Sequence, residues 1–451
     1  MSAPTHEVTN QPPPLVGYDV LGADLALVEA VRTYAGESTV SDLAFLGRLA
    51  GSEQAQRWGV DANAHPPVLR THDRYGHRVD EVDFHPAWHE LMRVAVDAGL
   101  HGAPWSAQAP KHAHLRRAAG FVVWSQVEAG HGCPVSMTYA AVPALRVDPA
   151  VAADWEPGLT ARSYEFGLRP ASAKSGLLAG MGMTEKQGGS DVRANTTRAD
   201  PLAADGEYAL TGHKWFCSAP MCDVFLLLAQ APGGLTCFVV PRVLPDGTRN
   251  VFRIQRLKDK LGNRSNASAE IELDRTWARR LGEEGRGVAT IIEMVSATRL
   301  DCVLGSTALM RQAVAQATHH ARHRSAFGGP LADKPLMRAV LADLAVESEA
   351  ATALAMRLAA AFDSGERDLR RLAVAVGKYW VCKRTPVLVG EALECLGGNG
   401  YVEENGLARL YREAPLNSIW EGSGNVNALD VVRALNREPA SLAALGKELA
   451  L

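Results

Sequence analysis

The strongest constraint on the fold of this chain is a change in its hydrophobic period. Between about residues 180 and 281, short aliphatic and aromatic runs alternate with turn signals such as Asp205-Gly206 and Asp246-Gly247. Runs of this length and spacing are typical of β-strands. The six runs cover residues 207–211, 213–217, 224–229, 235–240, 252–257 and 269–273. Six strands at this spacing predict a small antiparallel barrel or sandwich.

Residues on both sides of this β segment follow the helical period. Upstream, between Asp24 and about Ala141, apolar residues recur at helical spacing, and glycine and proline separate the runs. One helix is expected there to begin at Leu25, and three more are expected over residues 42–50, 88–98 and 115–128. Downstream, longer helices are expected over residues 288–324, from an Asp333 cap to 363, over 368–396 with a kink at Pro386, and over 425–435. Long helices with short links predict an up-and-down bundle.

This pattern divides the chain into three parts. We expect an N-terminal arm and α-helical domain at residues 1–179, a β-barrel domain at 180–284 and a C-terminal four-helix bundle at 285–451. The strand–helix alternation of a dinucleotide-binding sheet is missing. The proline-rich start of the chain predicts an extended arm, ordered where it lies against the body or a neighbouring subunit.

Composition excludes several classes of protein. The 451 residues are 47% hydrophobic, which is enough for a large core, and 47 basic against 50 acidic residues give a net charge of −3. A chain devoted to non-specific nucleic-acid binding would be strongly basic. The sequence has no run of about 18 apolar residues and no signal peptide, so we expect a soluble, cytoplasmic protein without a membrane partner.

Cysteine and histidine spacing indicates neither disulfide bonds nor a metal site. The seven cysteines are scattered without a Cys-x-x-Cys pair, which is typical of reduced thiols in the cytosol. The histidines between residues 85 and 131 fit no compact ligand set. We therefore expect no bound metal.

Two polar, glycine-rich loops are the candidates for ligand binding. The first, residues 181–195, combines Gly188 and Gly189 with the hydroxyl of Thr184, and the second covers residues 420–425. Glycines let a backbone approach a ligand, and loop N–H groups that converge on one point can bind an anion. Taken alone, the first loop could equally be a hairpin or omega-loop connection between strands.

The order of these and three further motifs resembles the acyl-CoA dehydrogenase family. The matching segments are residues 183–191, 214–218, 324–328, 396–401 and 419–423, and together the matches span about residues 85 to 435. The resemblance implies an acyl-CoA dehydrogenase-like fold with a helical domain, a central antiparallel β domain and a helical bundle. It also implies FAD as cofactor, an acyl-CoA or related small molecule as substrate, and a homotetramer in which an adjoining subunit completes each FAD site.

The resemblance assigns cofactor contacts to residues from all the motifs. In the family, the tryptophan at Trp215 flanks the flavin ring, Arg324 and Phe327 reach the FAD of an adjoining subunit, and Gly397-Gly398 form a pyrophosphate loop. The full set is Met183, Thr184, Gly189, Ser190, Trp215, Phe216, Cys217, Ser218, Arg324, Phe327, Glu394, Gly397, Gly398, Ser423 and Asn425. Without the resemblance, Trp215 could be a core aromatic residue and Arg324 a cation at a helix C-terminus. Glu394 stands where many relatives have glutamine, which could alter cofactor affinity.

Glu421 is the candidate catalytic base. Acyl-CoA dehydrogenation removes a proton from Cα and transfers a hydride from Cβ to flavin N5, so the protein must supply a base. A carboxylate screened from water has a raised pKa, which suits this task. The alternative is a glutamate that caps the helix beginning near Ser423. Some relatives carry the base on an earlier helix, at a position where this chain has Thr298, which cannot serve as a base.

The substrate is expected to contact residues on both sides of Glu421 and one residue of the earlier helix. These are Arg299, Trp420 and Gly422.

Three strings narrow the resemblance to the AidB branch, the flavoproteins of the adaptive response to DNA alkylation. They cover residues 181–192, 257–266 and 417–425. Members of that branch are feeble dehydrogenases and bind double-stranded DNA, largely through a basic domain after the bundle. This chain ends at Leu451, so we expect it to lack that domain, which weakens the expectation of DNA binding.

The alternative function is a DNA-protective flavoprotein that binds DNA or inactivates alkylating agents. For that role, cations along the bundle could form a basic stripe, although such charges are more often a solvated helical face. They are residues 311, 322, 324, 338, 370, 371, 378, 383 and 384.

Overall fold

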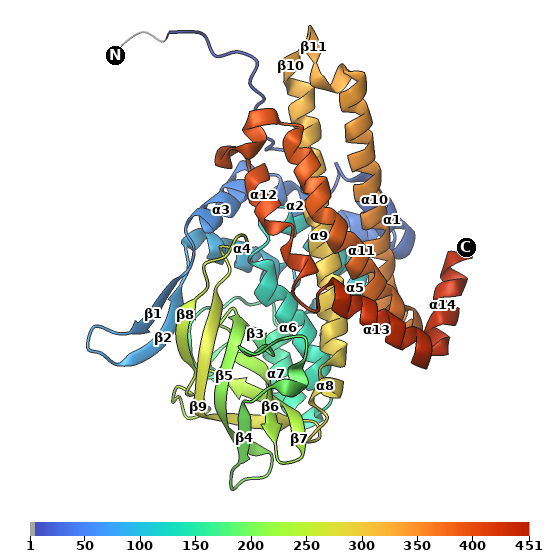
Figure 1. The fold of residues 1–451 in the computed structure, drawn as a ribbon. Coiled ribbons are helices and arrows are strands. Elements are labelled where there is room, and N and C mark those ends of the chain that lie inside the picture. Colours follow the sequence, from blue (N-terminus) through green and yellow to red (C-terminus); the bar gives the residue numbers. More distant parts are fainter. Residues whose placement is uncertain (1–4, 451) are drawn as a thin grey trace.

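Helix α9 (Ile292–His323) runs from the β-barrel at the bottom of Figure 1 to the hairpin at its top. The computed structural model describes residues 5–450. Long helices from both helical parts of the chain pack against α9: α5 (Ala113–Ser125), α6 (Gly132–Leu145), α10 (Pro335–Asp363) and α11 (Arg367–Glu394). Because its neighbours surround it, α9 is apolar and buried on most of its faces.

A buried ion pair joins the N-terminal part to α9. Arg117 of α5 binds both carboxylate oxygens of Asp301, and its Nη2 lies 2.8 Å from Asp301 Oδ2. Both side chains are almost fully buried. Since a buried charge is stable only when it is paired and hydrogen-bonded, this pair fixes the two helices in one register.

The N-terminal part contains more elements than the sequence predicts. Helices α1, α2, α4 and α5 correspond to predicted helices, whereas α3, α7 and the hairpin β1–β2 were not predicted. Their bounds are α1 Leu25–Ala35, α2 Glu37–Ala50, α3 Glu53–Ala64, β1 Val68–His72, β2 Arg78–Asp83, α4 Pro86–Asp97 and α7 Pro149–Thr160. The hairpin was missed because its strands are half-exposed and charged. Arg70 pairs there with Asp83 across the strands.

The central strands close into a barrel. Strand pairings run in a ring through β6, β4, β5, β9 and β7 and back to β6. Strand β3 pairs with β6, and β8 pairs with β9, outside this ring. The bounds are β3 Ala179–Gly182, β4 Arg198–Pro201, β5 Glu207–Ser218, β6 Val224–Ala231, β7 Gly234–Pro241, β8 Arg253–Leu257 and β9 Ser268–Leu281. Most pairings are antiparallel, as predicted, and the two exceptions are the parallel pairings of β6 with β3 and with β4.

Two of the predicted strands are one strand. The prediction placed a turn at Gly212, but β5 continues through it with a shift of register against β9. A Cβ at this position would lie 2.5 Å from Thr197 Oγ1, so the glycine permits β5 to approach Thr197, just before β4, closely. Gly212, which the sequence predicts as a turn residue, therefore lies at a β-bulge.

The C-terminal part is a bundle of long helices, as predicted, with corrections at its ends. Asp333 is not the cap of α10: it ends a 3₁₀ turn (Leu331–Asp333), and Lys334 takes the N-cap position without a side-chain hydrogen bond. Helix α11 remains helical across Pro386. A helix after the predicted end, α14 (Pro439–Leu449), was missed. The other elements are α8 Gly287–Thr290, β10 Ser325–Ala326, β11 Gly329–Pro330, α12 Leu407–Glu413 and α13 Gly424–Arg437.

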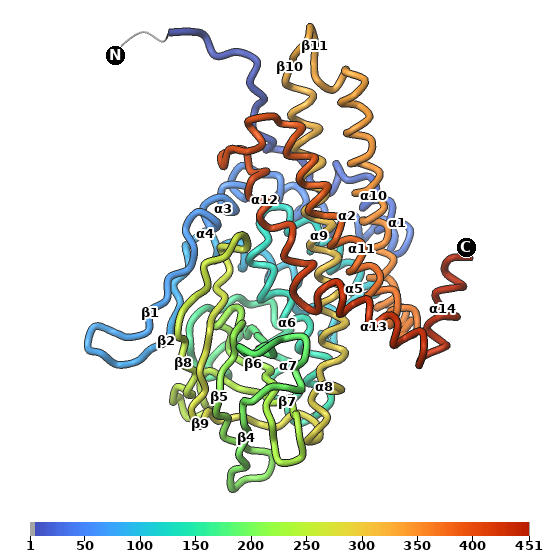
Figure 2. The backbone as a smooth tube through the Cα atoms, viewed as in Figure 1, coloured from blue at the N-terminus to red at the C-terminus, as the bar shows by residue number. Residues whose placement is uncertain are grey.

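The tube view shows how far the hairpin β10–β11 lies from the barrel (Figure 2). No helix within residues 5–450 has the length and apolar character that crossing a bilayer requires.

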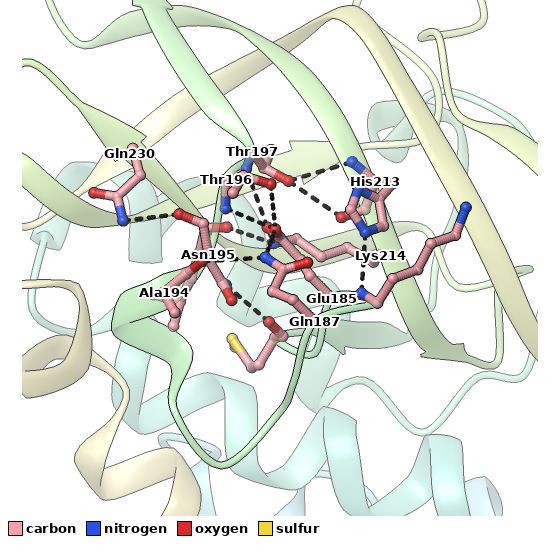
Figure 3. Close-up of polar contacts among 12 residues, drawn as sticks. Glu185, Gln187, Ala194, Asn195, Thr196, Thr197, His213, Lys214 and Gln230 are labelled. Atoms are coloured by element: carbon pink, nitrogen blue, oxygen red, sulfur yellow. Dashed lines mark hydrogen bonds and ion pairs between the residues drawn. The ribbon is translucent and has the colours of Figure 1, made fainter.

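A second buried ion pair holds the first glycine-rich loop onto the barrel (Figure 3). Lys214 of β5 lies 2.7 Å from Glu185 Oε1, and both side chains have 0% exposure. The other carboxylate oxygen accepts hydrogen bonds from Gln187 Nε2 at 2.8 Å and from the Thr196 N–H at 2.7 Å. Burial alone raises the pKa of Glu185, but the Lys214 ammonium and these hydrogen bonds hold it at about 2. The loop is therefore tied to β5 by charge.

We predict that Lys214→Met lowers the free energy of unfolding by about 3–5 kcal/mol, because it leaves the Glu185 carboxylate buried without a counter-charge. Urea unfolding at neutral pH measures this change. Lys186→Met is the matched control, because Lys186 is exposed in the same loop and is held there by its backbone N–H. A loss of stability no larger than in the control would contradict a structural role for the pair.

The Glu185–Lys214 pair also determines in which direction the stability of the fold changes at acid pH. The pKa of Glu185 is lower in the folded state than its ordinary value of 4.5, so its contribution is present above pH 4.5 and is lost as the pH falls toward 2. The double variant Lys214→Met/Glu185→Leu should lack this part of the acid destabilisation.

Candidate functional site

The first part of the site is the mouth of the barrel. Strand β3 leads into Met183 and Thr184, and the N–H of Trp215 on β5 donates to the Thr184 carbonyl oxygen at 2.9 Å. Asn195 Nδ2 donates to the Met183 carbonyl oxygen at 2.9 Å. A Cβ on Gly189 would lie 2.5 Å from Thr184 Oγ1, so the loop can fold this closely only with glycine there. Ser190 follows on the exposed outer side of the loop.

Positive side chains surround the indole ring of Trp215. Lys258 Nζ lies 3.5 Å from the ring centroid, and Lys186 and Arg256 lie within 6 Å of it. Lys258 is held by Glu270 Oε1 at 2.8 Å. Trp215 is thus not a core residue but a partly exposed aromatic ring in a positive environment, where the cations contact its π system.

The remaining predicted residues of β5 differ in where they lie. Phe216 is 50% exposed, and Ser218 is half-buried at the end of the strand. Cys217 belongs to the hydrophobic core, and burial raises the pKa of its thiol to about 12. The side chains of residues 215, 216 and 218 are therefore at least partly exposed at this strand, whereas that of Cys217 is enclosed.

The second part of the site is the turn that holds Glu421, between α12 and α13. Thr298 Oγ1 of α9 donates to Glu421 Oε2 at 2.6 Å, and Arg299 Nε donates to the Glu421 carbonyl oxygen at 3.2 Å. The residue keeps partial exposure, whereas its carboxylate lies in a desolvated environment. Burial raises the pKa of Glu421, while the Thr298 hydrogen bond and the charges of Lys378 and Arg299 oppose this rise.

Glu421 does not cap the following helix. Helix α13 begins at Gly424 with Ser423 as its N-cap, and no side chain accepts a hydrogen bond at that cap. The Glu421 carboxylate instead contacts Thr298, and its backbone has φ = 56°, in the left-handed region. A non-glycine residue there is strained, and such strain is characteristic of functional sites.

Three predicted neighbours of Glu421 lie around the same turn. Trp420 is half-buried and donates from Nε1 to Asn417 Oδ1 at 2.9 Å. The carbonyl oxygen of Gly422 accepts hydrogen bonds from Lys378 Nζ at 2.7 Å and from Asn427 Nδ2 at 2.6 Å. Asn425 is exposed on the first turn of α13.

Cys133, at the start of α6, is a buried thiol within electrostatic range of Glu421. Burial raises the pKa of this thiol to about 12, the Lys260 charge lowers it, and the Glu421 charge raises it.

Sequence reasoning missed two residues of this site. From the sequence, Thr298 is treated only as a residue that cannot act as a base. Its position next to Arg299, a predicted substrate contact, is the signal that places it at the site. Lys378 was grouped with surface cations, yet it is 1% exposed and its Nζ binds the turn. Periodicity along α11 places Lys378 among buried alanine and valine residues, which could have revealed it.

The third group of predicted residues lies elsewhere. Arg324 ends α9, and Phe327, at the tip of β10–β11, is 93% exposed. Arg299 and Arg324 are separated by about 37 Å along α9, at 1.5 Å per residue. Arg324 and the hairpin that follows it therefore lie far from the Glu421 turn within one subunit. Figure 1 shows the hairpin at the opposite end of the molecule from the barrel.

Glu394, Gly397 and Gly398 follow the C-terminal end of α11. Glu394 is the last residue of that helix, and the two glycines begin a 3₁₀ turn (Gly397–Tyr401). A Cβ on either glycine would meet no atom within 4 Å, and Tyr401 is 85% exposed. This loop is open to a ligand or to another chain.

The N-terminal arm is ordered against the body, beside Arg324. Asn10 donates from Nδ2 to the Ser325 carbonyl oxygen and accepts from the Ser325 N–H through Oδ1, both at 2.8 Å. Arg324 Nη1 donates to the Asn10 carbonyl oxygen at 2.5 Å. The arm therefore helps to orient the Arg324 side chain.

Comparison with protein families accounts for nearly the whole chain. The AidB N-terminal domain, described for the adaptive response protein, matches residues 10–166. The middle domain of acyl-CoA dehydrogenases matches residues 180–276, and the C-terminal domain of the same family matches residues 285–436.

Individual relatives agree with this assignment. The chain is 50% identical to AidB of Escherichia coli K12 over 440 residues, which cover 96% of this chain and 81% of AidB. Among solved structures, that of Caenorhabditis elegans ACDH-11 in complex with C11-CoA superposes with a TM-score of 0.92 at 29% identity, covering 100% of this chain and 79% of that one. A glutaryl-CoA dehydrogenase from Mycobacterium smegmatis in complex with FADH2 has the same fold, with a TM-score of 0.72 at 18% identity over 93% of this chain and 98% of that one. From these matches, the chain belongs to the AidB branch of the acyl-CoA dehydrogenase family.

Proposed function

We propose that this chain is an FAD-dependent, acyl-CoA dehydrogenase-like oxidoreductase in which Glu421 removes a proton from Cα of an acyl thioester. The observation that carries this proposal is the Glu421 turn. A desolvated carboxylate with a raised pKa is held there by Thr298. The ACDH-11 relative, solved with C11-CoA, supports an acyl-CoA as the class of substrate.

FAD is the cofactor of the family, and the residues of this chain fit it. Trp215 offers a partly exposed aromatic ring, Gly397 and Gly398 leave open space at their Cα atoms, and Ser423 has a hydroxyl without a helix-cap partner. Arg324 offers a guanidinium whose fork shape suits phosphate oxygens. When bound, FAD supplies the acceptor for the hydride that leaves Cβ.

The chain's own residues supply the proton chemistry. Thr298 donates to Oε2 of Glu421, which leaves Oε1 free to take the proton from Cα. The raised pKa increases the basicity of the carboxylate, because burial disfavours its charged form. Arg299 and Lys378 hold the carbonyl oxygens of Glu421 and Gly422, so the turn keeps its position as the proton moves.

We predict that Glu421→Gln slows α-proton exchange of a bound acyl thioester by about 100- to 10,000-fold, the usual contribution of a general base. Exchange in deuterated water, followed by mass spectrometry with isovaleryl-CoA, measures it. The variant should keep its fold and its FAD, because glutamine preserves the shape of the side chain.

The matched control is Glu438→Gln, which removes a carboxylate at the end of α13 that pairs with Arg371. Exchange should remain at the wild-type rate in this variant. If Glu421→Gln exchanges as fast as the wild type, Glu421 is not the base.

We propose further that the FAD site is completed by an adjoining subunit of a homotetramer. The separation of Arg324 and Phe327 from the Glu421 turn along α9 supports this arrangement, as does the exposure of the hairpin tip. The partner is then a second copy of this chain.

We predict that subunits with Trp215→Ala and subunits with Arg324→Ala each lose FAD binding but recover it together. Random pairing of equal amounts makes half of the pairs mixed, and each mixed pair contains one site with both residues intact, so about one quarter of the sites recover. Flavin fluorescence after co-expression or mixed refolding measures the recovery. Arg324→Ala subunits mixed with each other are the control. If both residues belonged to one subunit's site, the mixture would show no recovery.

We do not propose DNA protection as the main role, because five of the nine cations named for the stripe are paired with acids, stacked or buried. Arg311, Arg371 and Arg384 are in ion pairs with acids, Lys378 is buried and Arg370 stacks on Phe362. We predict that the protein binds duplex DNA weakly at low salt and without a steep salt dependence. A steep loss of affinity with added salt, in a fluorescence-anisotropy titration, would favour the alternative role.

All seven cysteines are free and buried, which supports our proposal of a cytoplasmic location.

A further inference from the structure

Lys378 is a buried cation to which the mechanism above gives only a minor part. It lies on α11 with 1% exposure, and no acid within residues 5–450 forms an ion pair with it. Its Nζ donates to the Gly422 carbonyl oxygen at 2.7 Å. Burying an ammonium without a counter-charge is costly, so its retention at this position needs a reason.

The turn that Lys378 contacts has an unusual backbone. Glu421 and Gly422 follow each other with φ values of 56° and 92°, both in the left-handed region. Left-handed conformations are unfavourable for residues with a Cβ, so the turn must be held by its surroundings. Side chains of three helices hold it: Arg299 of α9, Lys378 of α11 and Asn427 of α13 each donate to one of its carbonyl oxygens.

The charges near the Glu421 carboxylate are not equivalent. Arg299 Nη1 lies 2.6 Å from Asp430 Oδ2, so an acid compensates its charge, and Arg371, which shares Asp430, also pairs with Glu438. The Lys378 charge has no such acid. The other titratable groups facing the carboxylate are the thiols of Cys133 and Cys302, which burial keeps neutral by raising their pKa. Lys378 also opposes the effect of burial on the pKa of Glu421.

We propose that Lys378 is a positioning residue for Glu421. Its ammonium holds the Glu421–Gly422 turn in the left-handed conformation through the Gly422 carbonyl oxygen, and it places beside this turn a buried positive charge that pairs with no acid of residues 5–450. This inference rests on the proposed function only in taking Glu421 as the base. It gives Lys378 a role through Glu421, not through the substrate.

The test follows the ionisation of Glu421 directly. The carboxyl C=O stretching band is recorded by infrared difference spectroscopy as a function of pH in FAD-loaded protein. Subtracting the spectrum of the Glu421→Gln form of the same background isolates the band of Glu421. The measurement is made in the wild type, in Lys378→Met, which removes both the donor and the charge, and in Lys378→Gln, which keeps an N–H donor but removes the charge.

We expect the ionisation midpoint of Glu421 to rise by about one pH unit or more in both Lys378 variants, a tenfold change in the ratio of protonated to ionised form. Lys383→Met is the matched control, because Lys383 lies on the same helix near Gly424, is exposed and should leave the midpoint unchanged. Lys378→Gln should retain more of the wild-type thermal stability than Lys378→Met, since it can still donate to the Gly422 carbonyl oxygen.

Midpoints equal to that of the wild type in both Lys378 variants would overturn the proposal. So would loss of cooperative melting in both, which would give Lys378 a purely structural role. The titration needs no turnover, so a wild-type protein that never exchanges the α-proton would overturn the proposed function while leaving the titration result to decide this inference.

Discussion

The length of α9 sets the relation between the two halves of the proposed cofactor site. Its first turns carry Thr298 and Arg299 at the Glu421 turn, and its last residue leads into Arg324 and the exposed hairpin. Helix α9 packs against α5, α6, α10 and α11, and its length keeps its two ends apart. One subunit therefore presents the two halves at opposite ends of α9, and the proposed assembly would bring the halves of different copies together.

Buried charges occur between the N-terminal part and the bundle, within the β domain and within the bundle, and they follow two designs. Arg117–Asp301 and Glu185–Lys214 are compensated pairs that fix, respectively, the N-terminal part against the bundle and the first loop against the barrel. At the Glu421 turn, by contrast, the carboxylate and Lys378 are buried near each other without forming an ion pair. A compensated pair provides rigidity, whereas an acid left without a direct partner keeps the capacity to change its protonation state.

The fold class was predictable from the sequence because periodicity reports which face of each element is buried, and that signal is strong in the barrel and the long helices. The periodicity signal fails where burial is partial, as in the charged strands β1 and β2. It also fails where a glycine can belong to either a turn or a bulge, as at Gly212. Glu421 was accessible through its motif. Its contact with Thr298 was not, because 123 residues separate the two and only the packing of α9 brings them together.

The Thr298–Glu421 hydrogen bond bears on how such a site can change in evolution. Two chain segments, one on α9 and one before α13, deliver their side chains to the same point. A carboxylate placed on either segment would reach the same space, and a hydroxyl on the other would still satisfy it. The position of the acid can thus migrate between segments through intermediates that keep one acid and one neutral partner, while the surrounding helices stay unchanged.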